Sequence, residues 1–252
     1  MGTETCLTPE QIRHFRHNGY LKLPTLLPAE RVEQLRRAVT QDVKDAVDPV
    51  VRDSDDRVVR LSKLLDRDPI FRQSVTDDRV LELLSGLLGP HIEMVHNRHN
   101  HATLNLAHRN TDHFHRDVVQ WSRSIVTIIF YLEETHLDNG CTQLIPGTHL
   151  LPGVDVLHRI DENEWVAAAK LGGQAIPVPM PAGGMLAIDS LVFHRAGPNQ
   201  TDDTRMSMTI GYRSVDELAS VDDPTTELVL GRRGYMGNDG RSRNDGAERT
   251  TP

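Results

Sequence analysis

The segment that most limits the fold is an apolar, largely β-branched run from Ser124 to Leu132. A run of this kind, without polar alternation, is typical of a strand buried on both faces. Shorter apolar segments follow it, and Gly, Pro and Asn residues separate them. We expect further strands at residues 142–145, 185–188, 191–193 and 206–212. Many short strands joined by turns predict a mainly-β fold of the sandwich or jelly-roll type.

Residues 91–107, which precede this run, alternate between polar and apolar side chains. Alternation with a period of two predicts a strand with one polar face. That face would carry Asn97, His99, His101, Thr103 and Asn105.

Helical patterns dominate the part of the chain before residue 90. A capping box at Thr8–Gln11 begins one helix, which ends at Asn18-Gly19. A second helix is expected from Leu27 to Val39, and a third begins at Asp78 and ends at Gly86 or Gly89.

Two segments are candidate lids over a site. Residues 48–68 link helical regions and show little periodicity, so they form either a lid or a solvated linker. Residues 161–171 read as a helix inserted between core strands.

We expect one domain over residues 1–230. It would comprise a helical N-terminal part at about 8–90 and a jelly-roll core at about 91–215. Residues 231–252 contain almost nothing apolar and read as a mobile tail.

The charge balance excludes some partners. The chain has 28 Lys and Arg against 36 Asp and Glu, a net charge of −8. Because phosphate binding needs clustered cations, nucleic acid and anionic membranes are not expected partners. The sequence shows no membrane-spanning apolar run, no signal peptide and only two cysteines, which favours a cytoplasmic protein acting on a small molecule. The oligomeric state stays open.

Thirteen histidines direct attention to metal binding. On a strand, residues i and i+2 share a face, so His115 and Asp117 can present an imidazole and a carboxylate together. A histidine from a neighbouring strand, for which His194 is the candidate, would complete the arrangement of non-haem iron oxygenases. The other His-x-Asp triplet, His136–Asp138, runs into Asn139-Gly140 and is expected on an exposed turn.

Several motifs together resemble the phytanoyl-CoA dioxygenase family of iron(II)- and 2-oxoglutarate-dependent oxygenases. The resemblance spans about residues 8–215, including the opening Gln11–Tyr20. Its motifs are His115-x-Asp117, Asp138-Asn139-Gly140-Cys141, Pro146-Gly147-Thr148-His149, and His194 followed by Asn199 and Arg205.

The resemblance implies a double-stranded β-helix, a jelly roll of the cupin kind with flanking helices. It also implies that His115, Asp117 and His194 hold Fe(II) and are catalytic. Arg205 would bind the distal carboxylate of 2-oxoglutarate, which a planar guanidinium can do through two parallel hydrogen bonds. O2 is the second cosubstrate. The carboxylate at Asp117 favours hydroxylation, desaturation or oxidative ring closure over halogenation.

Other polar residues are candidates for the cosubstrate and substrate. Thr127, Asn105 and Thr103 could contact 2-oxoglutarate, or could satisfy backbone groups or water. His113 could line the pocket or replace a ligand, whereas His149 would shape the fold and Cys141 would be a small buried hydrophobe.

The expected substrate pocket is polar. The candidates for its lining, besides Asn97 and His113, are His99, His101, Arg116, Gln120 and Trp121. Such a lining suits a polyhydroxylated or charged substrate better than a fatty acyl chain. Among bacterial family members this resembles tailoring enzymes of antibiotic biosynthesis, including those that close rings on orthosomycins.

Two alternatives use fewer of these residues. A cupin-like metal-dependent isomerase or sugar-binding protein would keep the histidines and would not need Arg205. A pure interaction module would bind no metal.

Overall fold

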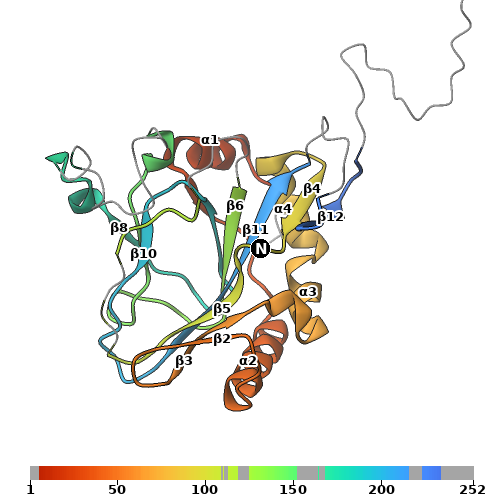
Figure 1. Cartoon of the computed structure of the whole chain (residues 1–252). Helices are drawn as coiled ribbons and strands as arrows, with labels where there is room; N and C mark the ends of the chain where they lie inside the picture. The colour runs from red at the N-terminus through yellow and green to blue at the C-terminus, as the bar shows by residue number, and fades with distance from the viewer. Residues whose placement is uncertain are drawn as a thin grey trace, which may run out of the picture.

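The computed structural model describes residues 6–108, 110, 113–118, 125–151, 164, 168–215 and 223–233. Two antiparallel sheets face each other in a jelly roll, and helices pack outside the larger sheet (Figure 1). The expected mainly-β fold is confirmed. The helices are α1 Pro9–Asn18, α2 Ala29–Lys44, α3 Pro69–Val75 and α4 Asp78–Leu88, with short 3-10 turns η1 Leu64–Asp66, η2 Thr148–Leu150 and η4 Leu171–Gln174.

The larger sheet has the strand order β1-β9-β6-β11-β5-β3-β2, and β4 joins it by pairing with β11 and β12. The smaller sheet has the order β10-β7-β8. The strands are β1 Tyr20–Lys22, β2 Val50–Arg52, β3 Val58–Ser62, β4 Ile92–Val95, β5 Asn100–Asn105, β6 Ile125–Tyr131, β7 Thr142–Leu144, β8 Ile176–Val178, β9 Met185–Asp189, β10 His194–Ala196, β11 Arg205–Ser214 and β12 Thr226–Leu230.

Strand β6 is buried on both faces, as its continuous apolar sequence predicts. Ile128 and Phe130 belong to the core that the larger sheet shares with the helices. Ile129 and Tyr131 belong to a second core between the two sheets. The alternation of side chains along the strand thus serves two cores at once.

The N-terminal helix forms as the capping box predicts. The Thr8 hydroxyl accepts from the Gln11 backbone N–H, and the Gln11 side chain accepts from that of Thr8. The helix ends at Gly19, whose φ of 77° lies in the left-handed region. Helix α4 continues through Gly86 and ends at Gly89.

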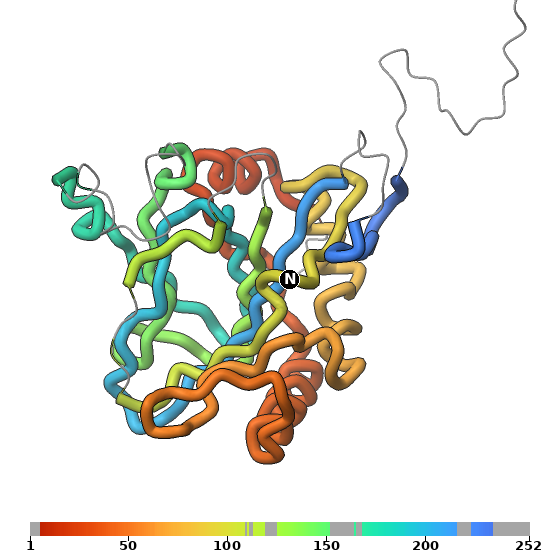
Figure 2. Tube along the Cα trace, in the orientation of Figure 1, coloured from red at the N-terminus to blue at the C-terminus, as the bar shows by residue number. Residues whose placement is uncertain are grey.

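Residues 48–68 are neither a simple lid nor a solvated linker. Strands β2 and β3 form a hairpin in this segment, and β3 pairs with β5 at the edge of the larger sheet. In Figure 2 the orange hairpin runs along β5. This corrects the expectation, because pairing with a neighbouring strand gave order to a segment without clear periodicity of its own.

The structure also differs from the sequence-based prediction at two of the expected strands. Residues 91–107 form β4 and β5, separated by a bend at residues 96–99. Residues 191–193 form a turn that leads into β10. The larger sheet also takes up β1, β2 and β3 from the N-terminal part, and β12 beyond residue 215.

Other expectations lie largely outside the described residues. These are the helix at 161–171, of which Glu164 and residues 168–171 are described, and the tail at 231–252, which is described only to residue 233. In the described part of the chain, no helix combines the length and apolarity needed to cross a membrane. Neither Cys6 nor Cys141 forms a disulfide bond within the described residues, and Cys141 is buried as expected.

Candidate metal centre and its cavities

A backbone bridge between distant segments brings the three expected ligands together. The N–H of His115 donates to the carbonyl of His194, and that of His194 donates back, each at 3.0 Å. Asp117 lies two residues further on the same face, and its N–H donates to the Ser190 carbonyl at 2.9 Å. One nitrogen of each histidine and one oxygen of Asp117 all lie within 4.8 Å of one another.

Both histidines are oriented by their own backbone. Nδ1 of His115 lies 3.0 Å from the His113 carbonyl, and Nδ1 of His194 lies 3.0 Å from the Val192 carbonyl. A carbonyl only accepts, so each Nδ1 carries the proton and each Nε2 keeps its lone pair. Two such nitrogens and one carboxylate oxygen on one side are the donor set of a non-haem iron site, so these residues fit the metal.

The electrostatics hold Asp117 as a carboxylate. Burial alone would raise its pKa, but His194, His99 and His115 together with the Thr127 hydroxyl lower the pKa below its usual value. Nε2 of His194 lies 3.5 Å from Oδ1 of Asp117. An ionised carboxylate is the form that binds a cation.

Thr127 orients this carboxylate. Its Oγ1 donates to Oδ2 of Asp117 at 3.1 Å and lies 2.8 Å from Oγ of Ser190. Since the Thr127 proton points to Asp117, Ser190 donates the second hydrogen bond. The Thr127 hydroxyl, one of the candidates for a cosubstrate contact, therefore supports a candidate metal ligand. Ser190 carries no signal in the sequence, because it reaches the site only through the pairing of β6 with β9.

Two adjoining cavities open beside the triad. The smaller, of about 320 Å³, is lined by Arg205 and Thr103 as well as by His115 and His194. Arg205 is only 3% exposed, and its guanidinium carbon lies 6.0 Å from the centre of the Tyr131 ring. Burial raises the pKa of Tyr131 to about 12, so this phenol stays neutral beside the arginine.

Asn105 does not line either cavity. It lies opposite Arg205 in the pairing of β5 with β11. Its Nδ2 donates to the carbonyls of Asn139 and Gly197, at 3.5 and 3.4 Å. Gly140, with a φ of 82°, packs here, because a Cβ at this residue would lie 2.3 Å from Nδ2 of Asn105. Asn105 thus supports the turn behind the smaller cavity.

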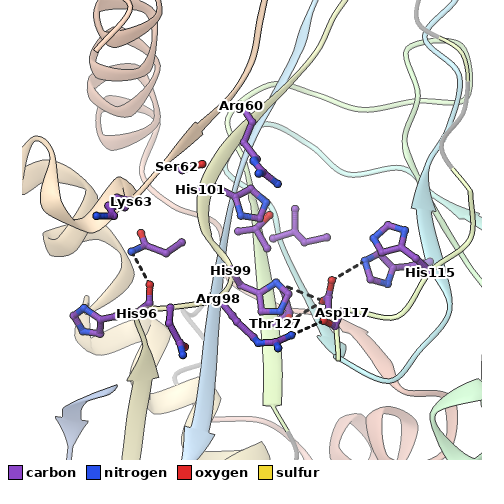
Figure 3. Close-up of a pocket in the computed structure, with 15 residues that line it drawn as sticks. Arg60, Ser62, Lys63, His96, Arg98, His99, His101, His115, Asp117 and Thr127 are labelled. Atoms are coloured by element: carbon purple, nitrogen blue, oxygen red, sulfur yellow. Dashed lines mark hydrogen bonds and ion pairs between the residues drawn. The ribbon is translucent and has the colours of Figure 1, made fainter. Parts of the chain in front are cut away.

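The larger cavity, of about 730 Å³, contains the triad and a polar wall (Figure 3). His99, His101 and Asn97 line it as expected. His99 has a φ of 50°, and its Nδ1 lies 3.8 Å from Oδ2 of Asp117. Burial, with Arg60 and His99 as smaller causes, lowers the pKa of His101 to about 4, so this ring is neutral at pH 7.

Other residues of this wall were not expected from the sequence. Among them are Arg60, Ser62, Lys63 and Arg98. The first three lie on β3 or directly after it, so the unexpected hairpin brings them to the cavity. No sequence signal distinguishes Arg60, Lys63 and Arg98 from surface cations.

The Arg116 side chain is buried in the core and does not line either cavity. It is 0% exposed, donates from Nη2 to the Thr148 carbonyl at 2.7 Å, and stacks over Phe193. Burial lowers its pKa to about 10. This placement corrects the expectation that Arg116 contacts substrate, because successive residues of an extended segment point to opposite faces.

Two of the remaining candidate residues are described by the structure, and two are not. The His113 side chain is exposed, and its carbonyl holds His115. Gln120 and Trp121 lie outside the described residues. Nε2 of His149 lies 3.0 Å from the Arg16 carbonyl, which is a structural contact.

The sequence matches a known protein family and is similar to known proteins. The phytanoyl-CoA dioxygenase (PhyH) family model matches residues 15–207. The methylphosphonate hydroxylase of Gimesia maris is 25% identical over 227 residues, which cover 84% of this chain and 83% of that protein.

Several solved structures share the fold, SnoK and EctD among them. The non-heme alpha-ketoglutarate-dependent carbocyclase SnoK from nogalamycin biosynthesis superposes with a TM-score of 0.72 at 18% identity, covering 89% of this chain and 97% of SnoK. EctD from S. alaskensis, solved with 2-oxoglutarate and 5-hydroxyectoine, superposes with a TM-score of 0.69 at 18% identity, covering 83% of this chain and 77% of EctD.

Proposed function

Because the chain belongs to the phytanoyl-CoA dioxygenase family, we propose that it oxidises an unactivated C–H bond of a polar, sugar-containing natural-product intermediate. The family and its structural neighbours are non-haem iron, 2-oxoglutarate-dependent oxygenases. The reaction would be a hydroxylation or an oxidative ring closure, with release of succinate and CO2.

The observation that carries this proposal is the convergence of the triad with Arg205. His115, Asp117 and His194 offer two nitrogens and one carboxylate oxygen to a single metal. Arg205 lines the cavity that also reaches His115 and His194. A buried guanidinium is well suited to a carboxylate of a dicarboxylic acid whose other end reaches the metal.

When bound, iron(II) with 2-oxoglutarate and O2 would supply an oxidant strong enough to remove hydrogen from an unactivated C–H bond. The residues of this chain would bind and orient the reactants. Asp117 would take one metal position, Thr127 would hold its carboxylate, and Arg205 would hold the cosubstrate.

The polar wall of the larger cavity supports the choice of substrate. His99, His101 and Asn97 offer hydrogen-bonding groups beside the triad, whereas a fatty acyl chain would need an apolar lining. The similarity to SnoK, a carbocyclase of nogalamycin biosynthesis, supports ring closure in antibiotic biosynthesis as one form of the reaction.

The metal ligands can be tested directly by spectroscopy. Loaded anaerobically with iron(II) and 2-oxoglutarate, the native chain should show the weak visible charge-transfer band of the chelated keto acid. His115→Ala, Asp117→Ala and His194→Ala should each abolish the band, because each removes one of only three protein ligands.

The second His-x-Asp triplet supplies a matched control. His136 and Asp138 lie on the turn before Gly140, away from both cavities. His136→Ala and Asp138→Ala should leave the band intact. If the band persists in all three triad variants, the assignment of the ligands is wrong.

A further inference from the structure

The larger cavity carries positive charge that its own wall does not balance. Arg60, Lys63 and Arg98 line it, and Asp117 is the one carboxylate among its described lining residues. The Asp117 carboxylate already faces His115 and His194. The positive charge of the wall is therefore left for a ligand.

Other cations near the same hairpin form ion pairs with acidic residues. Arg57 pairs with Asp53 and Asp55 at the hairpin tip, and Arg67 pairs with Asp42. Within the described residues, neither Arg60, Lys63 nor Arg98 has a carboxylate within 4.0 Å. In a chain with a net charge of −8, acidic partners are abundant, so three unpaired cations around one cavity are a specific feature.

The positions of these cations separate them from the cosubstrate residue. Nη1 of Arg98 donates to the backbone carbonyl of Asp117 at 3.3 Å, so its guanidinium lies beside the triad (Figure 3). Lys63 lies at the opposite side of the cavity wall (Figure 3). Arg205 lines only the smaller cavity, whereas Arg60 lines both.

We propose that the substrate carries an oxyanion group, of the phosphate or carboxylate type, which Arg98 binds beside the triad in the larger cavity. This inference rests on the proposed function, since it assigns 2-oxoglutarate to Arg205 and the substrate to Arg98. The exposed Arg98 can bind an oxyanion by charge-assisted hydrogen bonds without moving the core.

The test uses two small oxyanions, inorganic phosphate and acetate, as probes. The full chain, loaded anaerobically with iron(II) and saturating 2-oxoglutarate so that Arg205 is occupied, is titrated with each anion at constant ionic strength. The dissociation constant follows from the rise of the unfolding midpoint with anion concentration, because a ligand of the native state stabilises it. Sodium chloride is the reference salt.

We expect at least one of the two anions to bind, and the stronger one identifies the group as phosphate-type or carboxylate-type. Arg98→Gln should weaken that binding by roughly tenfold, because it removes a charge-assisted contact, whereas Lys63→Gln, at the opposite side of the cavity, should weaken it less. The matched control is Arg57→Gln, which removes an equally exposed cation of the hairpin that lines neither cavity, and it should leave the binding unchanged.

Two results would overturn the inference. One is that neither anion stabilises the native chain more than chloride. The other is that Arg98→Gln binds the anion as the native chain does. The charge-transfer band separates this outcome from failure of the proposed function. A band without anion binding overturns only the oxyanion site, and anion binding without a band overturns only the oxygenase assignment.

Discussion

Arg205 is the residue on which the choice between the candidate functions depends. A metal-dependent isomerase or a sugar-binding protein would need the histidines and would have no use for a buried guanidinium beside them. Arg205 begins β11 and lies opposite Asn105, and the turn at Gly140 supports it from behind. The surrounding structure therefore holds this cation at the wall of the smaller cavity.

We predict that Arg205→Ala weakens 2-oxoglutarate binding by about 2–5 kcal/mol, because it removes one partner of a desolvated charge pair. Anaerobic titration of 2-oxoglutarate into the iron-loaded chain, followed by the charge-transfer band, measures the change. Arg195→Ala is the control, since Arg195 stacks on Phe114 and bonds to Gln143 outside the cavities. Unchanged affinity in Arg205→Ala would favour the isomerase or sugar-binding alternative.

The hairpin of β2 and β3 is the element that adds most to the site beyond the residues predicted from the sequence. It supplies Arg60, Ser62 and Lys63 to the larger cavity, and its tip carries paired charges such as Arg57 with Asp53. Because β3 is paired on both sides, with β2 and with β5, it is a fixed wall. Only the tip is left as a segment that could respond to substrate.

We predict that hydrogen exchange divides residues 48–68 into two classes. Amides of β3 should exchange slowly even without substrate, at rates similar to those of β5, because their hydrogen bonds lie inside the sheet. Amides at residues 53–57 should exchange quickly. Mass spectrometry of peptides from the native chain measures both classes. Uniformly fast exchange over residues 48–68 would contradict the sheet pairing and restore the linker interpretation.

The stability of the whole molecule depends on pH through a histidine of the cavity wall. The folded His101 has a pKa of about 4, against 6.5 for an unperturbed histidine. As pH falls below 6.5, the unfolded chain takes up a proton that the folded chain refuses, so the unfolded state is stabilised. The effect grows until pH reaches about 4 and is absent above the unfolded pKa.

We predict that the free energy of unfolding of the metal-free chain falls by up to about 3 kcal/mol from this group between pH 6.5 and pH 4. His101→Gln should remove that part of the pH dependence, which denaturant unfolding at several pH values measures. His17→Gln, which replaces an exposed histidine of α1, is the control. An unchanged pH dependence in His101→Gln would show that His101 is not the group responsible.

Much of the fold could be predicted because its signals are local. The apolar run of β6, the capping box at Thr8 and the turn at Asn139-Gly140 each act over a few residues. The hairpin at residues 50–62 could not, because β2 and β3 are short and gain their order from pairing with β5. Likewise, the strand expected over 91–107 is broken at His99, whose left-handed backbone no alternation pattern reveals.

The sequence by itself determined the fold family and the residues of the candidate triad, because strand periodicity places His115 and Asp117 on one face and the motif spacing points to His194. Only the tertiary structure decided what surrounds them. Thr127 bonds to Asp117, Arg116 turns into the core, and Lys63 reaches the larger cavity. These outcomes depend on which distant strands pair and in which register, since a shift of one residue sends a side chain to the opposite face.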